Sequence, residues 1–147
     1  MVFRSAGFLS PNQSCPAPLV QVMEEWGIDV SAHRSYQVDE ASLAAADLVL
    51  TMEGQHVQKA TLLLQSAFPK VMPLKEAAHA MAATGGNLDA LLSRVAVDRD
   101  PTSYLSSRWD VDDPYNRKLK DYRRAVNEIS GLVDEVVGRL GALSTAG

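Results

Sequence analysis

The last quarter of the chain has the most regular hydrophobic pattern, with apolar residues recurring every three or four positions among polar ones. This spacing predicts an amphipathic helix over residues 117–140. The apolar positions are Leu119, Tyr122, Val126, Ile129, Val133, Val136 and Leu140.

Weaker helical patterns lie upstream, and residues that typically end or cap helices stand at some of their ends. The predicted helices cover residues 18–26, 39–43, 56–68 and 75–84. Gly27 is expected to end the first of them, and Asn87 to cap a further turn that runs through Val95.

Three short apolar runs predict strands, at residues 1–5 (ending at Gly7), 47–52 and 70–74. Branched apolar residues fill the second run, as in a strand that is buried on both faces of a parallel sheet. Short strands that alternate with helices predict an α/β fold, with a small parallel sheet between helical layers. Such sheets place their chemistry at the carboxyl ends of the strands.

A long polar loop, residues 97–116, leads into the last helix and contains Val111-Asp112-Asp113-Pro114-Tyr115. Proline disfavours a helical conformation for Asp113 and stiffens the loop. A carboxylate on a stiff loop beside an aromatic ring is a candidate proton donor. Asp-Pro also starts turns, and paired aspartates before a helix offset its dipole. Taken alone, the local pattern favours this structural role.

Composition narrows the class of protein. The 147 residues are close to one average domain, and the net charge of −4 argues against a general nucleic-acid binder. No apolar run reaches membrane-spanning length, and the N-terminus does not have the pattern of a signal peptide. The single cysteine, Cys15, excludes an internal disulfide and suits a reducing cytoplasm.

Candidate metal ligands do not cluster at ligand spacing, so neither a metal nor another cofactor is expected. Of the three histidines, His33 and His56 are expected to be structural, and His79 to be solvated on its helix.

Five short motifs occur along the chain in an order that resembles the order in one known family. In chain order they are Ser5-Ala6-Gly7, Gly27-Ile28-Asp29, Ser31-Ala32-His33-Arg34-Ser35, Ala46-Asp47-Leu48-Val49-Leu50-Thr51-Met52 with His56, and Asp113-Pro114-Tyr115. Together they resemble the low-molecular-weight protein-tyrosine phosphatases, in the form common among actinobacterial proteins. The resemblance covers residues 4–74 and 111–140. The related arsenate reductases share much of the pattern.

The resemblance implies a function and a site. The family hydrolyses phosphate monoesters such as phosphotyrosine through a cysteinyl-phosphate. By resemblance, Asp113 is the general acid that protonates the leaving oxygen, and Tyr115 lines the mouth of the substrate pocket. The implied partners are phosphotyrosine proteins or small phosphate esters, and neither nucleic acid nor a membrane is expected.

The nucleophile is where this sequence departs from the family. The family signature is Cys-x5-Arg between the first strand and the first helix, where backbone amides bind phosphate and lower the pKa of the thiol. Here only four residues precede Ser5-Ala6-Gly7. Six places after Cys15 stands Gln21, and Pro16 and Pro18 remove amide donors. We therefore expect the chain as given to be truncated at its N-terminus and to be inactive by itself. Whether the protein is an enzyme is left open by the sequence. The alternatives are a non-catalytic binding protein or gene remnant, and a relative of the arsenate reductases.

The same departure affects the predicted fold. By resemblance the sheet order is 2-1-3-4, so the expected missing strand is central, and its neighbours would expose unpaired edges. A start site assigned too far downstream, a gene remnant, or closing of the two strands would each account for this pattern. Self-association through the unpaired edges is the expected consequence.

We predict one phosphatase-like domain over residues 1–147, with residues 77–110 as an insertion and mobile loop.

Overall fold

The computed structural model describes residues 1–84 and 87–141. The chain forms two compact units, which are described in turn. The first comprises residues 1–39 and 112–127, and the second comprises residues 40–111 and 128–147.

The second unit contains a two-stranded parallel sheet. Strand β1 (Val49–Thr51) pairs with strand β2 (Val71–Pro73). Its register pairs Val49 with Val71, Leu50 with Met72, and Thr51 with Pro73. Pro73 has no N–H to donate and is the last residue of its strand, as predicted. Both strands lie within the predicted runs, and they confirm the small parallel sheet.

The crossover between the two strands is helical. Helix α3 (Gly54–Leu63) is followed by the 3-10 helix η1 (Gln65–Lys70). The sequence predicted one helix over residues 56–68, which is wrong at its end. Leu64 is extended, with φ of −147°, so the α-helix stops there and a tighter turn containing Pro69 leads into β2.

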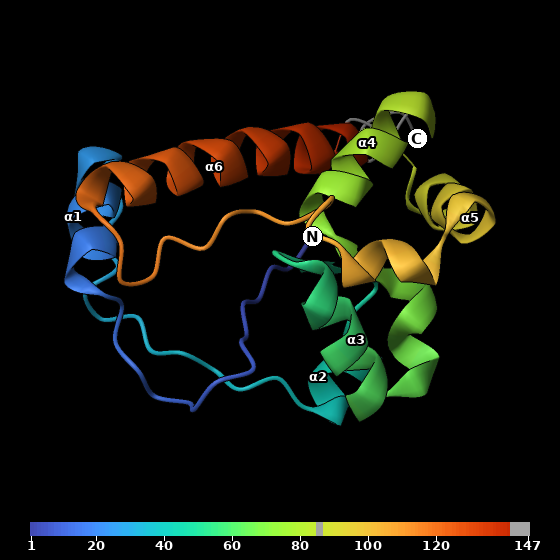
Figure 1. Cartoon of the computed structure of the whole chain (residues 1–147), viewed down its shortest axis with the longest axis horizontal. Helices are drawn as coiled ribbons and strands as arrows, with labels where there is room; N and C mark the ends of the chain where they lie inside the picture. Colours follow the sequence, from blue (N-terminus) through green and yellow to red (C-terminus); the bar gives the residue numbers. More distant parts are fainter. Residues whose placement is uncertain (85–86, 142–147) are drawn as a thin grey trace. The chain divides into compact units, whose positions relative to one another are not determined.

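Helices also fill the region that follows the sheet. Helix α4 (Leu74–Thr84) and helix α5 (Leu88–Asp98) lie beside each other, as Figure 1 shows, and the 3-10 helix η2 (Pro101–Leu105) follows. Asn87 caps α5, because its Oδ1 accepts a hydrogen bond from the Ala90 amide at 3.0 Å. The predicted loop over residues 97–116 therefore contains the end of α5 and all of η2. The assignment of residues 77–110 as an insertion stays a prediction.

The hydrophobic core of this unit forms between the sheet and helices α4, α5 and α6 (Leu119–Gly141). Helix α6 belongs to the first unit up to residue 127 and to the second from residue 128. The short helix α2 (Glu40–Ala45) precedes β1 and buries Leu43. The core residues are Met72, Leu74, Ala77, Ala78, Ala80, Met81, Leu91, Val95 and Val136.

The first unit is built around helix α1 (Ala17–Glu25), which confirms the predicted first helix. Gly27 has φ of +71°, a conformation that favours glycine, and it ends this helix as expected. Glu25 accepts hydrogen bonds from the guanidinium of Arg123 at 2.6 and 2.9 Å, which joins α1 to the start of α6. Isolated bridges, Gly7 with Gln37 and Ser14 with Arg34, hold the loops.

The predicted strand at residues 1–5 is wrong. Met1, Val2 and Phe3 are 74%, 85% and 67% exposed, and pairing begins only at Gly7. A short apolar run becomes a strand when a neighbouring strand accepts its hydrogen bonds, and none lies beside residues 1–5 in the described part of the chain. Across the residues that the structure describes, no helix is both long and apolar enough to cross a bilayer.

Candidate functional site

The Asp113-Pro114-Tyr115 loop forms a tight turn in the first unit. The Tyr115 amide donates a hydrogen bond to Asp113 Oδ1 at 2.9 Å, and the Arg117 amide donates one to the Pro114 carbonyl at 2.9 Å. Asn116 completes the turn with φ of +59°, a conformation that asparagine tolerates. The Asp113 carboxylate is exposed, and the Tyr115 side chain is 63% exposed. The structure thus brings together the two predicted site residues at a loop tip.

The adjacent aspartate has different surroundings. Asp112 Oδ2 accepts hydrogen bonds from the guanidinium of Arg117 at 2.8 Å and from that of Arg124 at 2.9 Å. Within the described residues, the Tyr115 amide is the one hydrogen-bond partner of the Asp113 carboxylate. Asp112 is therefore held in an ion-pair cluster, whereas Asp113 has one oriented oxygen and one oxygen open to an incoming group.

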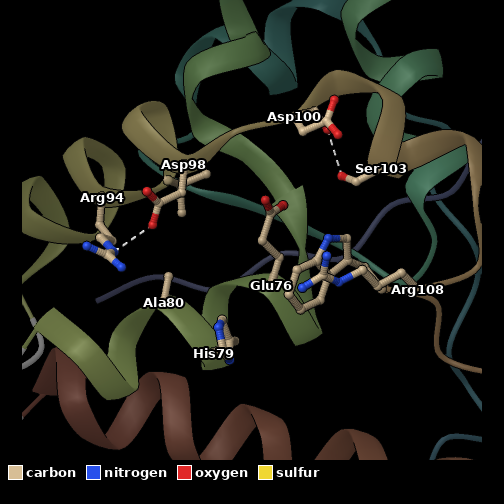
Figure 2. Close-up of a pocket in the computed structure, with 10 residues that line it drawn as sticks. Glu76, His79, Ala80, Arg94, Asp98, Asp100, Ser103 and Arg108 are labelled. Carbon is tan, nitrogen blue, oxygen red and sulfur yellow. Dashed lines mark hydrogen bonds and ion pairs between the residues drawn. The ribbon is translucent and has the colours of Figure 1, made fainter.

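A separate pocket of about 230 Å³ lies within the second unit. Figure 2 shows that its side chains come from α4, α5, η2 and the segment after η2. The lining residues are Glu76, His79, Ala80, Arg94, Val95, Asp98, Asp100, Ser103, Arg108 and Trp109.

Glu76 is the buried acid of this pocket, with 9% of its surface exposed. The Tyr104 hydroxyl donates to its carboxylate at 2.7 Å and itself accepts from Arg99 Nε at 2.7 Å. Burial raises the pKa of Glu76, and this effect outweighs the hydrogen bond from Tyr104 and the charges of Arg99 and Arg108, which lower it. Burial also raises the pKa of Tyr104, and the neighbouring carboxylate adds to this rise.

Other polar groups of the pocket pair with one another. Arg94 forms an ion pair with Asp98 at 2.8 Å, and the Ser103 hydroxyl donates to the Asp100 carbonyl at 2.7 Å. These contacts give each group a structural partner, and they place no nucleophile beside a base. We therefore treat the pocket as a polar part of the helical packing.

The Glu76, Tyr104 and Arg99 cluster was not predicted from sequence. Arg99 also donates to the carbonyls of Phe68 and Val71, and its guanidinium lies 3.8 Å from the centre of the Phe68 ring. These partners are 28 or more positions apart in sequence, except for Tyr104 and Arg99. Periodicity reports which face of a helix is buried, and it does not identify a partner at such a distance.

The remaining candidates do not form a second site. Cys15 is partly exposed in the loop before α1, and His33 is exposed. His79 is exposed as predicted, and its ring packs against that of Trp109 with 5.7 Å between centres. Among the described residues, no three His, Cys, Asp or Glu side chains are placed to hold a metal ion.

Comparisons with known proteins agree on one family. The family model described as "Low molecular weight phosphotyrosine protein phosphatase" matches residues 1–90. The chain is 30% identical over 137 residues to a Ralstonia nicotianae protein named "Probable low molecular weight protein-tyrosine-phosphatase EpsP", covering 93% of this chain and 74% of that protein. It is 24% identical over 143 residues to the protein-arginine-phosphatase of Geobacillus stearothermophilus, covering 92% and 85%.

Solved structures are similar over nearly the whole chain. A low molecular weight protein tyrosine phosphatase from T. tengcongensis superposes with a TM-score of 0.68 at 28% identity, covering 93% of this chain and 76% of that one. A YwlE mutant from Bacillus subtilis superposes with a TM-score of 0.70 at 26% identity, covering 94% and 76%. These similarities confirm the predicted α/β fold class.

Proposed function

Because the chain belongs to the low molecular weight phosphotyrosine protein phosphatase family, we propose that its 147 residues supply the acid side of a phosphate-monoester hydrolase. In this proposal Asp113 protonates the leaving oxygen, and Tyr115 lines the mouth of the substrate pocket. The observation that carries it is the contrast between the two adjacent aspartates. Asp112 is held by two arginines, whereas Asp113 is oriented by one amide and keeps an oxygen open.

The reaction assigned to Asp113 follows from the chemistry of the family. A cysteine thiolate attacks phosphorus, the bond from phosphorus to the phenolic oxygen breaks, and the leaving phenolate takes the proton of Asp113. Water then hydrolyses the cysteinyl-phosphate. Cys15 is the single cysteine of these 147 residues, and the residue six places after it is Gln21, so it does not begin a Cys-x5-Arg sequence. We therefore propose that these residues alone do not catalyse the reaction.

The first experiment measures p-nitrophenyl phosphate hydrolysis by the purified 147-residue chain. We expect no turnover, because a phosphate dianion needs the amide-lined loop and the forked arginine of Cys-x5-Arg. The variants Cys15→Ser and Asp113→Asn are the controls. Turnover that either substitution abolishes would show that the chain contains a working nucleophile or acid.

A second experiment tests Asp113 directly. It uses a protein in which the strand and Cys-x5-Arg loop of a relative precede Met1. In this background Asp113→Asn should lower kcat on phosphotyrosine by about 10²–10⁴-fold, the usual contribution of general acid catalysis, with KM nearly unchanged. Asp112→Asn should have little effect on kcat. Equal losses in the two variants would contradict the assignment of the acid.

The same protein can also distinguish substrates, because one relative is a protein-arginine-phosphatase. Phosphotyrosine and phosphoarginine peptides are the paired substrates, and we propose preferential hydrolysis of phosphotyrosine. We also propose a cytoplasmic location, which suits the single unpaired Cys15.

A non-catalytic binding protein on the same scaffold is the second candidate, and the absence of Cys-x5-Arg from these 147 residues supports it. The genomic DNA upstream of Met1 separates the two candidates. An in-frame Cys-x5-Arg pattern there would support the enzyme, and in-frame stop codons would support the binding protein.

A further inference from the structure

We propose that Lys75 and Asp110 are positioning residues, which hold the two ends of the segment that presents the general acid. This inference rests on the proposed role of Asp113. The part of this segment that belongs to the first unit is residues 112–127, and the chain continues from it into the second unit at Val111, beside Asp110, and at Glu128. The Lys75 ammonium contacts both Asp110 and Glu128.

The first end of the segment is fixed through the Asp110 side chain. The Gly54 amide donates a hydrogen bond to Asp110 Oδ1 at 2.8 Å. Gly54 is the first residue of α3, and its neighbour Glu53 makes no side-chain cap for this helix. Asp110 therefore caps α3 from a position 56 residues away, at the end of the helix where the dipole favours a negative charge.

The next residue is fixed by its backbone and by burial. The Val111 amide donates to the Met52 carbonyl at 2.8 Å, directly after β1, and the Val111 side chain is 4% exposed. The loop that carries Asp113 thus starts from a residue that is anchored to the end of the sheet. One residue, Asp112, separates this anchor from Asp113.

Lys75 ties this start to the other end of the segment. Its ammonium donates to the Asp110 carbonyl at 2.6 Å and forms an ion pair with Glu128 Oε1 at 2.6 Å. The Lys75 and Glu128 side chains are 30% and 34% exposed, so bulk water screens the pair only in part. One cation therefore holds both points between which residues 111–127 run.

Such an anchor matters because proton transfer depends strongly on distance. A general acid acts at about 2.6–3.2 Å from the atom that it protonates. A misplacement of about 1 Å at a reacting group can cost on the order of 10²-fold in rate. Releasing the segment at its ends should therefore weaken protonation by Asp113, while groups that bind the phosphate are not altered.

The first test uses hydrogen exchange on the 147-residue chain. In Lys75→Met and Asp110→Ala, the Val111 amide should exchange about tenfold faster or more. The amide exchanges when this part of the chain opens locally, and each variant removes a charged hydrogen bond at Asp110 that such opening must otherwise break. Lys70→Met is the matched control, since Lys70 also donates to main-chain carbonyls, those of Ala44 and Ala46, in the same unit. Unchanged Val111 exchange in both variants, or an equal increase in Lys70→Met, would overturn the proposal.

The second test is a kinetic cycle in the protein with a Cys-x5-Arg loop ahead of Met1. Lys75→Met should lower kcat more on phosphotyrosine than on p-nitrophenyl phosphate, whose better leaving group needs less protonation, and KM should stay unchanged. In the Asp113→Asn background Lys75→Met should cause no further loss of kcat. Additive losses would show that Lys75 does not act through Asp113 and would overturn the inference. If Asp113→Asn alone had no effect on kcat, the proposed function would fail, and the exchange result would still report on the anchor.

Discussion

Gly54 lies where α3 meets η2, and an added methyl group there has no space. A Cβ built at this position would lie 2.8 Å from the carbonyl oxygen and 2.9 Å from the Cα of Tyr104. Both contacts are to backbone, so no side-chain rotation can relieve them. We predict that Gly54→Ala pushes η2 away from α3 and destabilises the second unit.

The magnitude follows from two opposing effects. Overpacking of this kind costs about 1–3 kcal/mol in the free energy of unfolding. Replacing glycine with alanine offsets about 0.4–1 kcal/mol, because the unfolded chain loses conformational freedom. The expected net loss is thus about 0.5–2 kcal/mol. Gly131 is the matched control, since it is exposed inside α6 and a Cβ there meets nothing within 4 Å. Gly131→Ala should raise stability by about 0.5–1 kcal/mol.

The assay is urea unfolding followed by far-UV circular dichroism, at one protein concentration for all variants. With a urea dependence of about 1–3 kcal/mol per molar, the Gly54→Ala midpoint should fall by roughly 0.2–2 M. The Gly131→Ala midpoint should rise. A rise in both variants would show that α3 and η2 do not pack as closely as the structure has them.

Three further predictions concern the second unit. Burial raises the pKa of Glu76 above its ordinary value of 4.5, so its contribution to stability is complete below pH 4.5 and is lost as the pH rises through the folded-state pKa. Glu76→Gln keeps an acceptor for the Tyr104 hydroxyl and should flatten this decline in the urea midpoint, whereas an unchanged slope would contradict the cause. Arg99→Lys should lower stability by about 1–3 kcal/mol, because the single nitrogen of lysine replaces three guanidinium nitrogens that donate to the Tyr104 hydroxyl and to the carbonyls of Phe68 and Val71. An unchanged urea midpoint would refute this. In the described part of the chain β1 pairs with β2 alone, so we expect the protein to self-associate through the free edge of the sheet. Light scattering should show an average mass that rises with protein concentration, and a monomer at every concentration would count against this prediction.

The sequence predicted the elements whose pattern is local. Helix α1 has an apolar face and a glycine stop at Gly27, and α6 keeps its spacing over six turns, so both helices lie close to their predicted bounds. The strands β1 and β2 were predicted from branched apolar runs between helices, and Pro73 marks the end of β2. These signals depend on neighbours within a few residues, which a single sequence contains.

Long-range contacts could not be predicted in the same way. Residues 1–5 have the apolar pattern of a strand, yet no neighbour in the described chain accepts their hydrogen bonds. Asp110 caps α3 from 56 positions away, and Arg99 reaches the Val71 carbonyl across 28 positions. A sequence pattern gives no measure of such distances, because they depend on how helices and strands pack.

The structure also bears on the two roles that the sequence suggests for Asp113, a structural role in a turn and a catalytic role as an acid. From sequence, a turn role and an acid role competed for this residue. The geometry is compatible with both roles, since Oδ1 accepts a hydrogen bond from the Tyr115 amide within the turn, and Oδ2 is open for the proposed proton transfer. Asparagine keeps an oxygen at the position of Oδ1 and cannot supply the acidic proton. Asp113→Asn should therefore preserve the loop and remove only the proton transfer, whereas Asp112→Asn weakens ion pairs with Arg117 and Arg124 and leaves the acid in place. The two variants separate chemistry from loop structure, and for this reason their unequal effect on kcat tests the site.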